Sequence, residues 1–250
     1  MKTINSRSNE EIKVVSSLHD SKGRKELKQF IAQGKRTCGT LIENEVKIVQ
    51  LYVTQEHLTD AQDIIGDYFI TVVNDQVMEK ISTTITPSGI VAVFEMPKEP
   101  SFSDLKAGLV LAQIHDPGNM GTLIRTAAAL AIPNVIIVEG ADVWSPKVVQ
   151  ATAGALAQVK IYTPSWDTLV KWKKDLRLCA LVVKGGKKPQ ELDSKNMLLI
   201  VGNEATGIAK EWLRDCNDYM TIPMPGKTES LNAAVAGSIG MYLAFANPTS

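Results

Sequence analysis

Hydrophobic residues in the second half of the chain fall into short, almost unbroken runs rich in Val, Ile and Leu. Longer stretches of helical composition separate these runs. Strands without polar alternation are buried on both faces, which is typical of a parallel sheet covered by helices. The pattern predicts strands at Leu109–Ile114, Val135–Val138, Val159–Tyr162, Leu178–Val183, Met197–Val201 and Tyr219–Ile222, with helices at 119–131, 145–157, 165–174, 207–215 and 230–246.

The first part of the chain shows a weaker version of the same pattern. Short apolar runs predict strands between short helices, at 40–43, 46–53, 70–73 and 90–94. Residues 96–104 carry two prolines and no periodicity, which indicates a linker. We therefore expect a small α/β domain over residues 1–96, a linker over 97–104 and a larger α/β domain over 105–250.

Composition narrows the classes of protein. Hydrophobic residues make up 44% of the 250 residues and charged residues 22%, as in ordinary soluble globular proteins. The N-terminus lacks the apolar stretch of a secretory signal, and the run 231–246 is shorter than the roughly 20 residues that cross a membrane. Cys38, Cys179 and Cys216 form no C-x-x-C pair, which favours buried thiols in a reducing cytosol. We predict a cytoplasmic protein with no metal and no membrane partner.

Charge is unevenly distributed although the net charge is zero. Residues 1–36 contain nine Lys or Arg against four acidic residues. Such a segment is either an anion-contacting arm or a solvated helix face. Lysines at 171–174 and 184–188 offer an alternative basic surface. The candidate contacts in the first segment are Arg24, Lys25, Lys28, Lys35 and Arg36.

Two loops that follow predicted strands near the C-terminus carry candidate chemistry, at 202–207 and 222–230. Ligands of α/β proteins bind at such loops. Residues 226–228 look like the end of a phosphate-binding loop, but that motif needs a glycine where this chain has Thr221, and two prolines in the span have no N–H to donate. The second loop therefore suits a nucleoside better than a polyphosphate, with Ser230 as the expected N-cap of the next helix.

A third loop, residues 115–125, follows the first strand of the larger domain. Asn119 is placed to cap the following helix, and Gly121 and Arg125 lie four apart on one face of it. A residue without a side chain one turn below an arginine leaves a hollow with a cation at its rim. The spacing alone leaves open a second interpretation, in which Arg125 forms a surface salt bridge.

The three loops together resemble, in order and spacing, the three motifs of the SpoU (TrmH-like) RNA 2′-O-ribose methyltransferases of the SPOUT superfamily. The resemblance covers roughly residues 105–246. It implies an α/β fold with a trefoil-knotted, mostly parallel sheet and helices on both faces, preceded by a small α/β RNA-binding domain. Ala233-Ala234 replaces the usual Val-Ser and keeps the volume small. The motifs read Asn119-x-Gly-x-x-x-Arg125, Gly202-Asn-Glu204-x-x-Gly207 and Ile222-Pro-Met-x-Gly226-x-x-x-Ser230-Leu-Asn232.

The same resemblance implies S-adenosylmethionine as cofactor and structured RNA, rRNA (23S above all) or tRNA, as substrate. Because a guanidinium stays protonated, we expect Arg125 to act as an electrostatic clamp and Glu204 or a water molecule to accept the proton. The implied cofactor-binding residues are Val201, Gly202, Ile222, Met224 and Leu231, and the implied polar residues around the ribose are Asn119, Arg125, Glu204, Ser230 and Asn232.

Oligomeric state and alternatives follow from the same segments. The last helix, 230–246, is apolar almost all the way round, so we expect a homodimer that covers it, as the family resemblance also implies. One alternative is an inactive RNA-binding protein on the same fold, which retention of the polar motif residues disfavours. A Rossmann-type enzyme would need a G-x-G-x-x-G turn after the first buried strand, and the sequence has none there.

Overall fold

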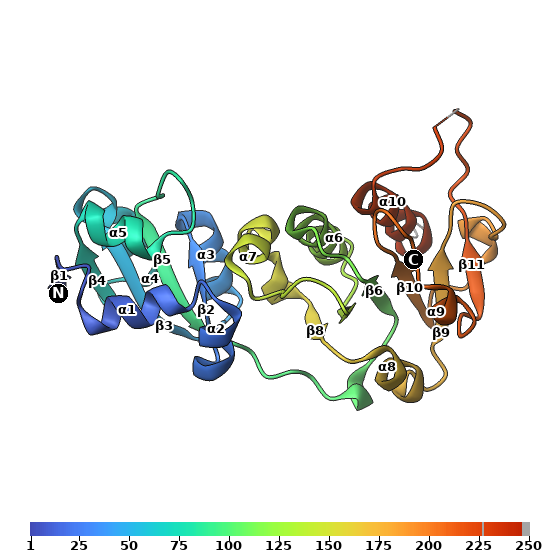
Figure 1. The fold of residues 1–250 in the computed structure, drawn as a ribbon, viewed down its shortest axis with the longest axis horizontal. Coiled ribbons are helices and arrows are strands. Elements are labelled where there is room, and N and C mark those ends of the chain that lie inside the picture. Colours follow the sequence, from blue (N-terminus) through green and yellow to red (C-terminus); the bar gives the residue numbers. More distant parts are fainter. Residues whose placement is uncertain (227, 247–250) are drawn as a thin grey trace. The chain divides into compact units, whose positions relative to one another are not determined.

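The computed structural model describes residues 1–226 and 228–246 (Figure 1). Lys227, part of the phosphate-loop comparison, lies outside the described residues. The chain forms two compact units. The first comprises Met1–Lys98 and Asp142–Ala157, and the second comprises Glu99–Ala141 and the described residues from Gln158 onward. The first unit thus includes a segment that the expected domain division places in the larger domain.

The first unit is built on a five-stranded sheet in the order β1-β4-β3-β5-β2. β1, β4 and β3 are parallel, whereas β5 runs antiparallel to β3 and β2. The strands are β1 Lys2–Ile4, β2 Gln29–Gln33, β3 Ile48–Thr54, β4 Ile70–Val73 and β5 Ile90–Glu95, and the helices are α1 Glu10–Ser17, α2 Ser21–Leu27, α3 Lys35–Glu43, η1 Gln55–His57, α4 Leu58–Ile65, α5 Asp75–Ile81 and α7 Pro146–Thr152.

The strand predicted at 40–43 is wrong, because these residues end α3. Thr37, Cys38 and Leu41 are its buried residues, and their spacing places them on one face of a helix. The short apolar run that suggested a strand is part of this helical stripe. Burial also raises the pKa of the Cys38 thiol to about 12, so this cysteine is an unreactive core residue.

The segment 142–157 joins the first unit through specific packing. The ring of Trp144 lies 4.9 Å from that of Phe30, measured between centroids. Gly154, with φ +88°, leaves room for Thr40, whose Cβ would lie 2.7 Å from any Cβ at position 154. This close packing explains why the segment around α7 groups with the first unit.

The structure overturns the RNA contact predicted for Arg24. Its side chain is buried, pairs with Asp142 (N···O 2.7 Å) and donates to the carbonyls of Leu18 and His19. A buried guanidinium needs this pairing and is not available to a phosphate. Lys35 is exposed but lies in hydrogen bonds with two carboxylates, those of Asp60 and Asp63, which raise its pKa. The other three predicted RNA contacts, Lys25, Lys28 and Arg36, are exposed, and their contact with RNA stays a prediction.

The second unit is built on a six-stranded, fully parallel sheet in the order β11-β9-β10-β6-β7-β8. The six strands predicted for this part of the chain are confirmed. The strands are β6 Gly108–Ala112, β7 Asn134–Val138, β8 Lys160–Tyr162, β9 Arg177–Leu181, β10 Met197–Val201 and β11 Asp218–Met220, and the helices are η2 Phe102–Asp104, α6 Pro117–Ala129, α8 Trp166–Trp172, η4 Pro189–Glu191, α9 Lys210–Leu213 and α10 Ala233–Phe245. A short helix, η3 Ala155–Gln158, spans the boundary between the two units.

Helices cover both faces of this sheet. Figure 1 shows α6 and α10 on one side and α8 and α9 on the other. On the second side, Trp166 and Trp212 stack at 4.7 Å between centroids and close the core. The predicted α/β class, with a parallel sheet between helix layers, is confirmed.

Two predicted helix caps are wrong. Asp116, not Asn119, caps α6, because its side chain accepts from the Asn119 N–H (2.7 Å). Asn232, not Ser230, caps α10 and accepts from two backbone N–H groups. In both cases another carboxylate or amide side chain occupies the capping position.

We predict that Arg24→Ala lowers the free energy of unfolding by about 3 to 5 kcal/mol, the usual cost of removing one partner of a buried ion pair. The exposed neighbour provides the control, since Lys25→Ala should change stability by less than about 0.5 kcal/mol. Urea denaturation followed by circular dichroism measures both. Equal stability of the two variants would contradict a structural role for Arg24.

Candidate active site

A pocket opens at the carboxyl ends of three neighbouring strands, β9, β10 and β11. Open α/β sheets bind ligands outside the carboxyl ends of their strands, and the pocket has this position in the sheet. The cavity volume is about 350 Å³, within the range of small-molecule sites.

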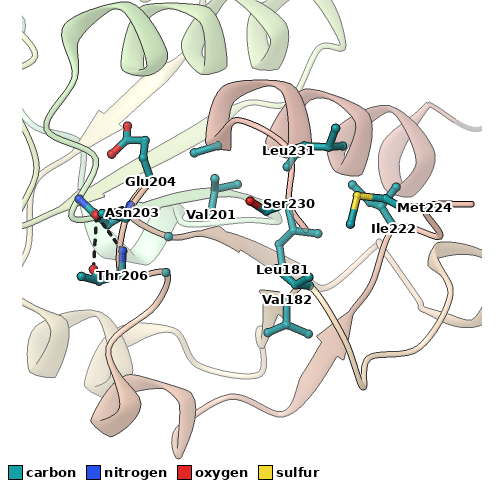
Figure 2. A pocket seen from close by; sticks show the side chains of 16 residues that line it. Leu181, Val182, Val201, Asn203, Glu204, Thr206, Ile222, Met224, Ser230 and Leu231 are labelled. Carbon is teal, nitrogen blue, oxygen red and sulfur yellow. Dashed lines mark hydrogen bonds between the residues drawn. The ribbon is translucent and has the colours of Figure 1, made fainter. Parts of the chain in front are cut away.

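All five predicted cofactor-binding residues line this one pocket: Val201, Gly202, Ile222, Met224 and Leu231. Figure 2 shows Val201 between Glu204 on one side and Ile222 and Met224 on the other. Glu204 and Ser230, two of the predicted catalytic residues, line it as well. The structure thus brings the second and third motifs together, and the roles of their residues stay predictions.

Gly202 allows the tight turn that follows β10 and lines the pocket. A Cβ at Gly202 would lie 2.5 Å from the carbonyl carbon of Gly207, closer than real Cβ contacts. The backbones of Asn203 and Gly207 exchange two hydrogen bonds, of 3.0 and 2.9 Å. Residues 202–207 therefore form a tight loop in which position 202 accepts only glycine.

Asn203 fixes the interior of this loop. Its Oδ1 accepts from the backbone N–H groups of Ala205 and Thr206, and its Nδ2 donates to the carbonyl of Gln113 (2.9 Å) (Figure 2). These bonds tie the loop to the end of β6. The side chain of Glu204 is consequently presented from a rigid turn.

A chain of hydrogen bonds links the three motifs at the pocket. Because Asn232 uses its Oδ1 to cap α10, its Nδ2 faces outward and donates to Asn119 Oδ1 (3.2 Å). Asn119 then donates through Nδ2 to Glu204 Oε1 at 2.7 Å. Each amide orientation follows from the previous one, so the Glu204 carboxylate receives a donor with a defined direction.

Arg125 does not join this group within the chain. It is exposed and lines a separate groove between α6 and α10, together with Tyr242 and Leu243. Among the residues that the structure describes, no carboxylate lies within 4 Å of its guanidinium, so the surface salt bridge considered for Arg125 is not formed there. Within one chain, Arg125 thus lines another groove than the predicted cofactor-binding residues do, and its place around the ribose stays a prediction.

Sequence reasoning missed one wall of the pocket. Leu181, Val182 and Val183, at the end of β9, line it, as do Thr206 and Ala236. The signal was present, since an apolar run that ends at Gly185-Gly186 marks the carboxyl end of a strand. Nothing distinguishes such an end from an ordinary core strand until the strand order is known.

Asp218 fastens β11 beside β9. Burial opposes its ionisation, but hydrogen bonds from Lys187 and Arg177 hold the pKa of Asp218 below its usual value. The Asp218 carboxylate lies 2.9 Å from the Lys187 ammonium nitrogen and 2.7 Å from a guanidinium nitrogen of Arg177. β11 in turn positions the loop that carries Ile222.

The pocket fits a cationic, nucleoside-bearing cofactor. Among its described lining residues, Glu204 is the one charged side chain, and a lone carboxylate complements a positive sulfonium. Backbone groups of Gly202, Ile222 and Leu231 would hold the adenosine part, between the apolar side chains of Val201 and Met224. None of the lining residues that the structure describes is a cation, which a polyphosphate site needs unless several N–H groups are free.

The described residues contain neither a metal-binding cluster nor a membrane-spanning helix. In residues 1–226 and 228–246, no set of three or more His, Cys, Asp or Glu is arranged to hold a metal ion. In the same part of the chain, no helix has the length and apolar character of a membrane span.

A family model described as the SpoU rRNA methylase family matches residues 106–242, more than half of the chain. The protein belongs to this family. A second model, described as an MRM3-like substrate binding domain, matches residues 9–92. The expected membership of the SpoU 2′-O-methyltransferases is therefore confirmed.

Relatives match almost the whole chain of this SpoU family member. The 23S rRNA (guanosine(2553)-2′-O)-methyltransferase RlmP of Bacillus subtilis is 29% identical, over 97% of this chain and 98% of its own. The 23S rRNA (uridine(2479)-2′-O)-methyltransferase of Streptomyces viridochromogenes is 29% identical, over 86% and 81%. The solved AdoMet-bound rRNA methyltransferase from Sinorhizobium meliloti has a TM-score of 0.86 and 27% identity, over 100% and 99%. The protein is an RNA methyltransferase whose cofactor is S-adenosylmethionine.

We predict that Gly202→Ala weakens binding of S-adenosylmethionine by roughly tenfold or more, because overpacking costs about 1 to 3 kcal/mol. Gly39→Ala, in α3 of the first unit, is the control, since a Cβ there lies 3.9 Å from its nearest neighbour, a methyl group of Ile64, which is an ordinary contact. Isothermal titration calorimetry measures both affinities. Wild-type affinity in Gly202→Ala would contradict the tight turn as part of the cofactor site.

Proposed function

We propose that this methyltransferase modifies a ribose 2′-hydroxyl of 23S rRNA, in the cytoplasm. The observation that carries the proposal is the hydrogen-bonded Glu204 beside Ser230 at the cofactor pocket. The relatives named above as 23S rRNA 2′-O-methyltransferases support the choice of RNA. The nucleotide differs between those two relatives, so the target within 23S rRNA follows from experiment.

The chain's own groups have a simple task in this reaction. When bound, S-adenosylmethionine supplies a methyl group on a positive sulfur, so the protein must align the hydroxyl and remove its proton. Glu204 accepts this proton. Asn119 orients the Glu204 carboxylate through a hydrogen bond of 2.7 Å. Ser230 contacts the ribose from the loop on the other side of the pocket.

The first part of the chain serves as the RNA-binding domain in this proposal. Residues 1–96 form that domain, 97–104 the linker and 105–250 the catalytic domain, and the match of residues 9–92 to a substrate binding domain supports it. Phosphate contacts come from exposed cations, namely Lys25, Lys28, Lys35 and Arg36.

The catalytic domain adopts a trefoil knot in this proposal. β11 lies at the sheet edge beside β9, yet the next element, α10, returns to pack on β10 and α6 in the middle of the sheet. A chain that crosses back over its own strand ends in this way supports threading of the C-terminal segment through a loop. The family resemblance supports the same topology.

A homodimer would cover the groove between α6 and α10. Val235, Ile239, Tyr242 and Leu243 are exposed large hydrophobic residues on α10. An exposed apolar surface of this kind marks an interaction site. A twofold interface uses the same face of both copies, so the partner's α10 would cover the groove that holds Arg125. In the proposed dimer, Arg125 extends from this interface to the pocket of the other copy and clamps the RNA there.

Glu204→Gln should lower turnover by about a hundredfold or more, since a positioned general base contributes at least that much. Binding of S-adenosylmethionine should weaken far less than turnover, because the backbone groups of the pocket are unaltered and only the attraction between the carboxylate and the sulfonium is lost. Purified enzyme with radiolabelled cofactor and unmodified 23S rRNA gives the rate, and calorimetry gives the affinity.

The same variant tests the substrate in cells. Mapping of ribose methylation should show one 23S rRNA site that disappears when the gene is deleted, returns with the wild-type gene and stays absent with Glu204→Gln. Unchanged rRNA methylation after deletion would contradict the proposed function.

A mixing experiment tests whether Arg125 acts on the partner's pocket. Arg125→Ala and Glu204→Gln should each be nearly inactive, but their mixed dimer has one site with both residues intact. Co-expression in equal amounts should then restore about a quarter of wild-type turnover, because half of the dimers are mixed and each has one working site. No gain on co-expression, or a monomeric mass in sedimentation, would contradict this arrangement.

A further inference from the structure

The target ribose is flanked by two phosphates, and the described residues that line the pocket offer them no cation. Its described lining residues contain one charged side chain, the Glu204 carboxylate. A phosphate beside this carboxylate would be repelled unless a positive group lies near. Arg125 is a single guanidinium in a separate groove, and one cation does not neutralise two phosphates. A second cation near the pocket is therefore needed.

The loop after β9 carries a lysine next to residues that line the pocket. Leu181, Val182 and Val183 line the pocket, and Lys184 follows them directly. Figure 2 shows Leu181 and Val182 on the side of the pocket that faces Ser230 and Leu231. Lys184 is exposed, so its side chain is accessible to a large ligand.

The loop is anchored immediately after Lys184. Gly186 N–H donates to Thr221 Oγ1 (2.9 Å). The backbone of Lys187 donates to the carbonyl of Tyr219 in β11 (2.8 Å) and accepts from the N–H of Thr221, which follows β11 (3.0 Å). A Cβ at Gly186 would lie 2.7 Å from the carbonyl carbon of Met220, so the loop lies against β11 without room for a side chain. Lys184 thus extends from a fixed base.

Charge in this loop is unbalanced. Residues 184–188 contain three lysines and no acidic residue. Lys187 is occupied by Asp218, at 2.9 Å. Throughout the described part of the chain, no carboxylate lies within 4 Å of the ammonium groups of Lys184 or Lys188. Lys184 is therefore an exposed positive group next to the pocket that forms no ion pair with the described residues.

We propose that Lys184 binds a backbone phosphate of the RNA next to the target ribose. The 2′-hydroxyl and the 3′-phosphate are attached to neighbouring carbons of the ribose. A ribose at the entrance of the pocket therefore has its 3′-phosphate at the edge of the pocket. A lysine provides a compact charge that needs no fixed geometry, which suits a phosphate whose sequence context varies. This inference rests on the proposed RNA methylation and adds a positioning residue to it.

The test compares Lys184→Gln with Lys160→Gln in the full-length protein. Lys160 is also exposed, but it begins β8 at the opposite, amino-terminal edge of the same sheet. The probe is an unmodified 23S rRNA transcript. Loss of one phosphate contact should weaken its binding about fivefold at 0.1 M salt and lower the salt slope by roughly 0.7. Lys184→Arg should restore both, and Lys160→Gln should change neither.

Two further measurements separate the possible outcomes. The affinity for S-adenosylmethionine should stay within about twofold of wild type. If Lys184→Gln weakened cofactor binding and left RNA binding intact, Lys184 would contact the cofactor carboxylate and the inference would be overturned. It would also fall if wild-type protein methylated the transcript while Lys184→Gln matched Lys160→Gln. A wild-type protein that neither binds nor methylates this RNA would instead refute the proposed function.

Discussion

The close approach of α10 to the sheet is the constraint on which the catalytic geometry depends. A Cβ at Gly237 would lie 2.5 Å from Leu123 of α6 and 2.9 Å from Val201 of β10, so only glycine allows this packing. The approach brings Asn232, the cap of α10, within hydrogen-bond distance of Asn119 on the first turn of α6. The packing of α10 on α6 and β10 thus determines how the Glu204 carboxylate is oriented, through the hydrogen bonds from Asn232 to Asn119 and from Asn119 to Glu204.

The sequence predicted the parts of this molecule that depend on burial on two faces. The six strands of the parallel sheet appear as apolar runs because helices cover both sides of them, as Figure 1 shows. The prediction failed where burial is one-sided and short, as in α3, and where two polar residues compete for one cap, as Asp116 and Asn119 do. Local pattern cannot decide such cases, because tertiary contacts choose between nearly equal local structures.

The same limit applies to charges and to the site. The order of three motifs was enough to gather residues as distant as Asn119 and Asn232 at one pocket. A count of charges, however, does not distinguish a solvated cation from a buried one, so Arg24 was assigned to RNA although it holds Asp142. For Arg125, the direction in which it points is a property of the packed helices and, in the proposed dimer, of a second copy.

Charge balance explains why a single carboxylate suits this pocket. Before the proposed reaction, the negative Glu204 faces a positive sulfonium, so the pocket is neutral as a whole. When Glu204 takes the hydroxyl proton and the sulfur loses its methyl group, both become neutral together. No net charge is created or stranded among apolar residues such as Val201 and Leu231, where an unpaired charge would be costly. Cations are needed only outside, at the phosphates, and in the two proposals Lys184 and Arg125, which are absent from the described lining of the pocket, supply them.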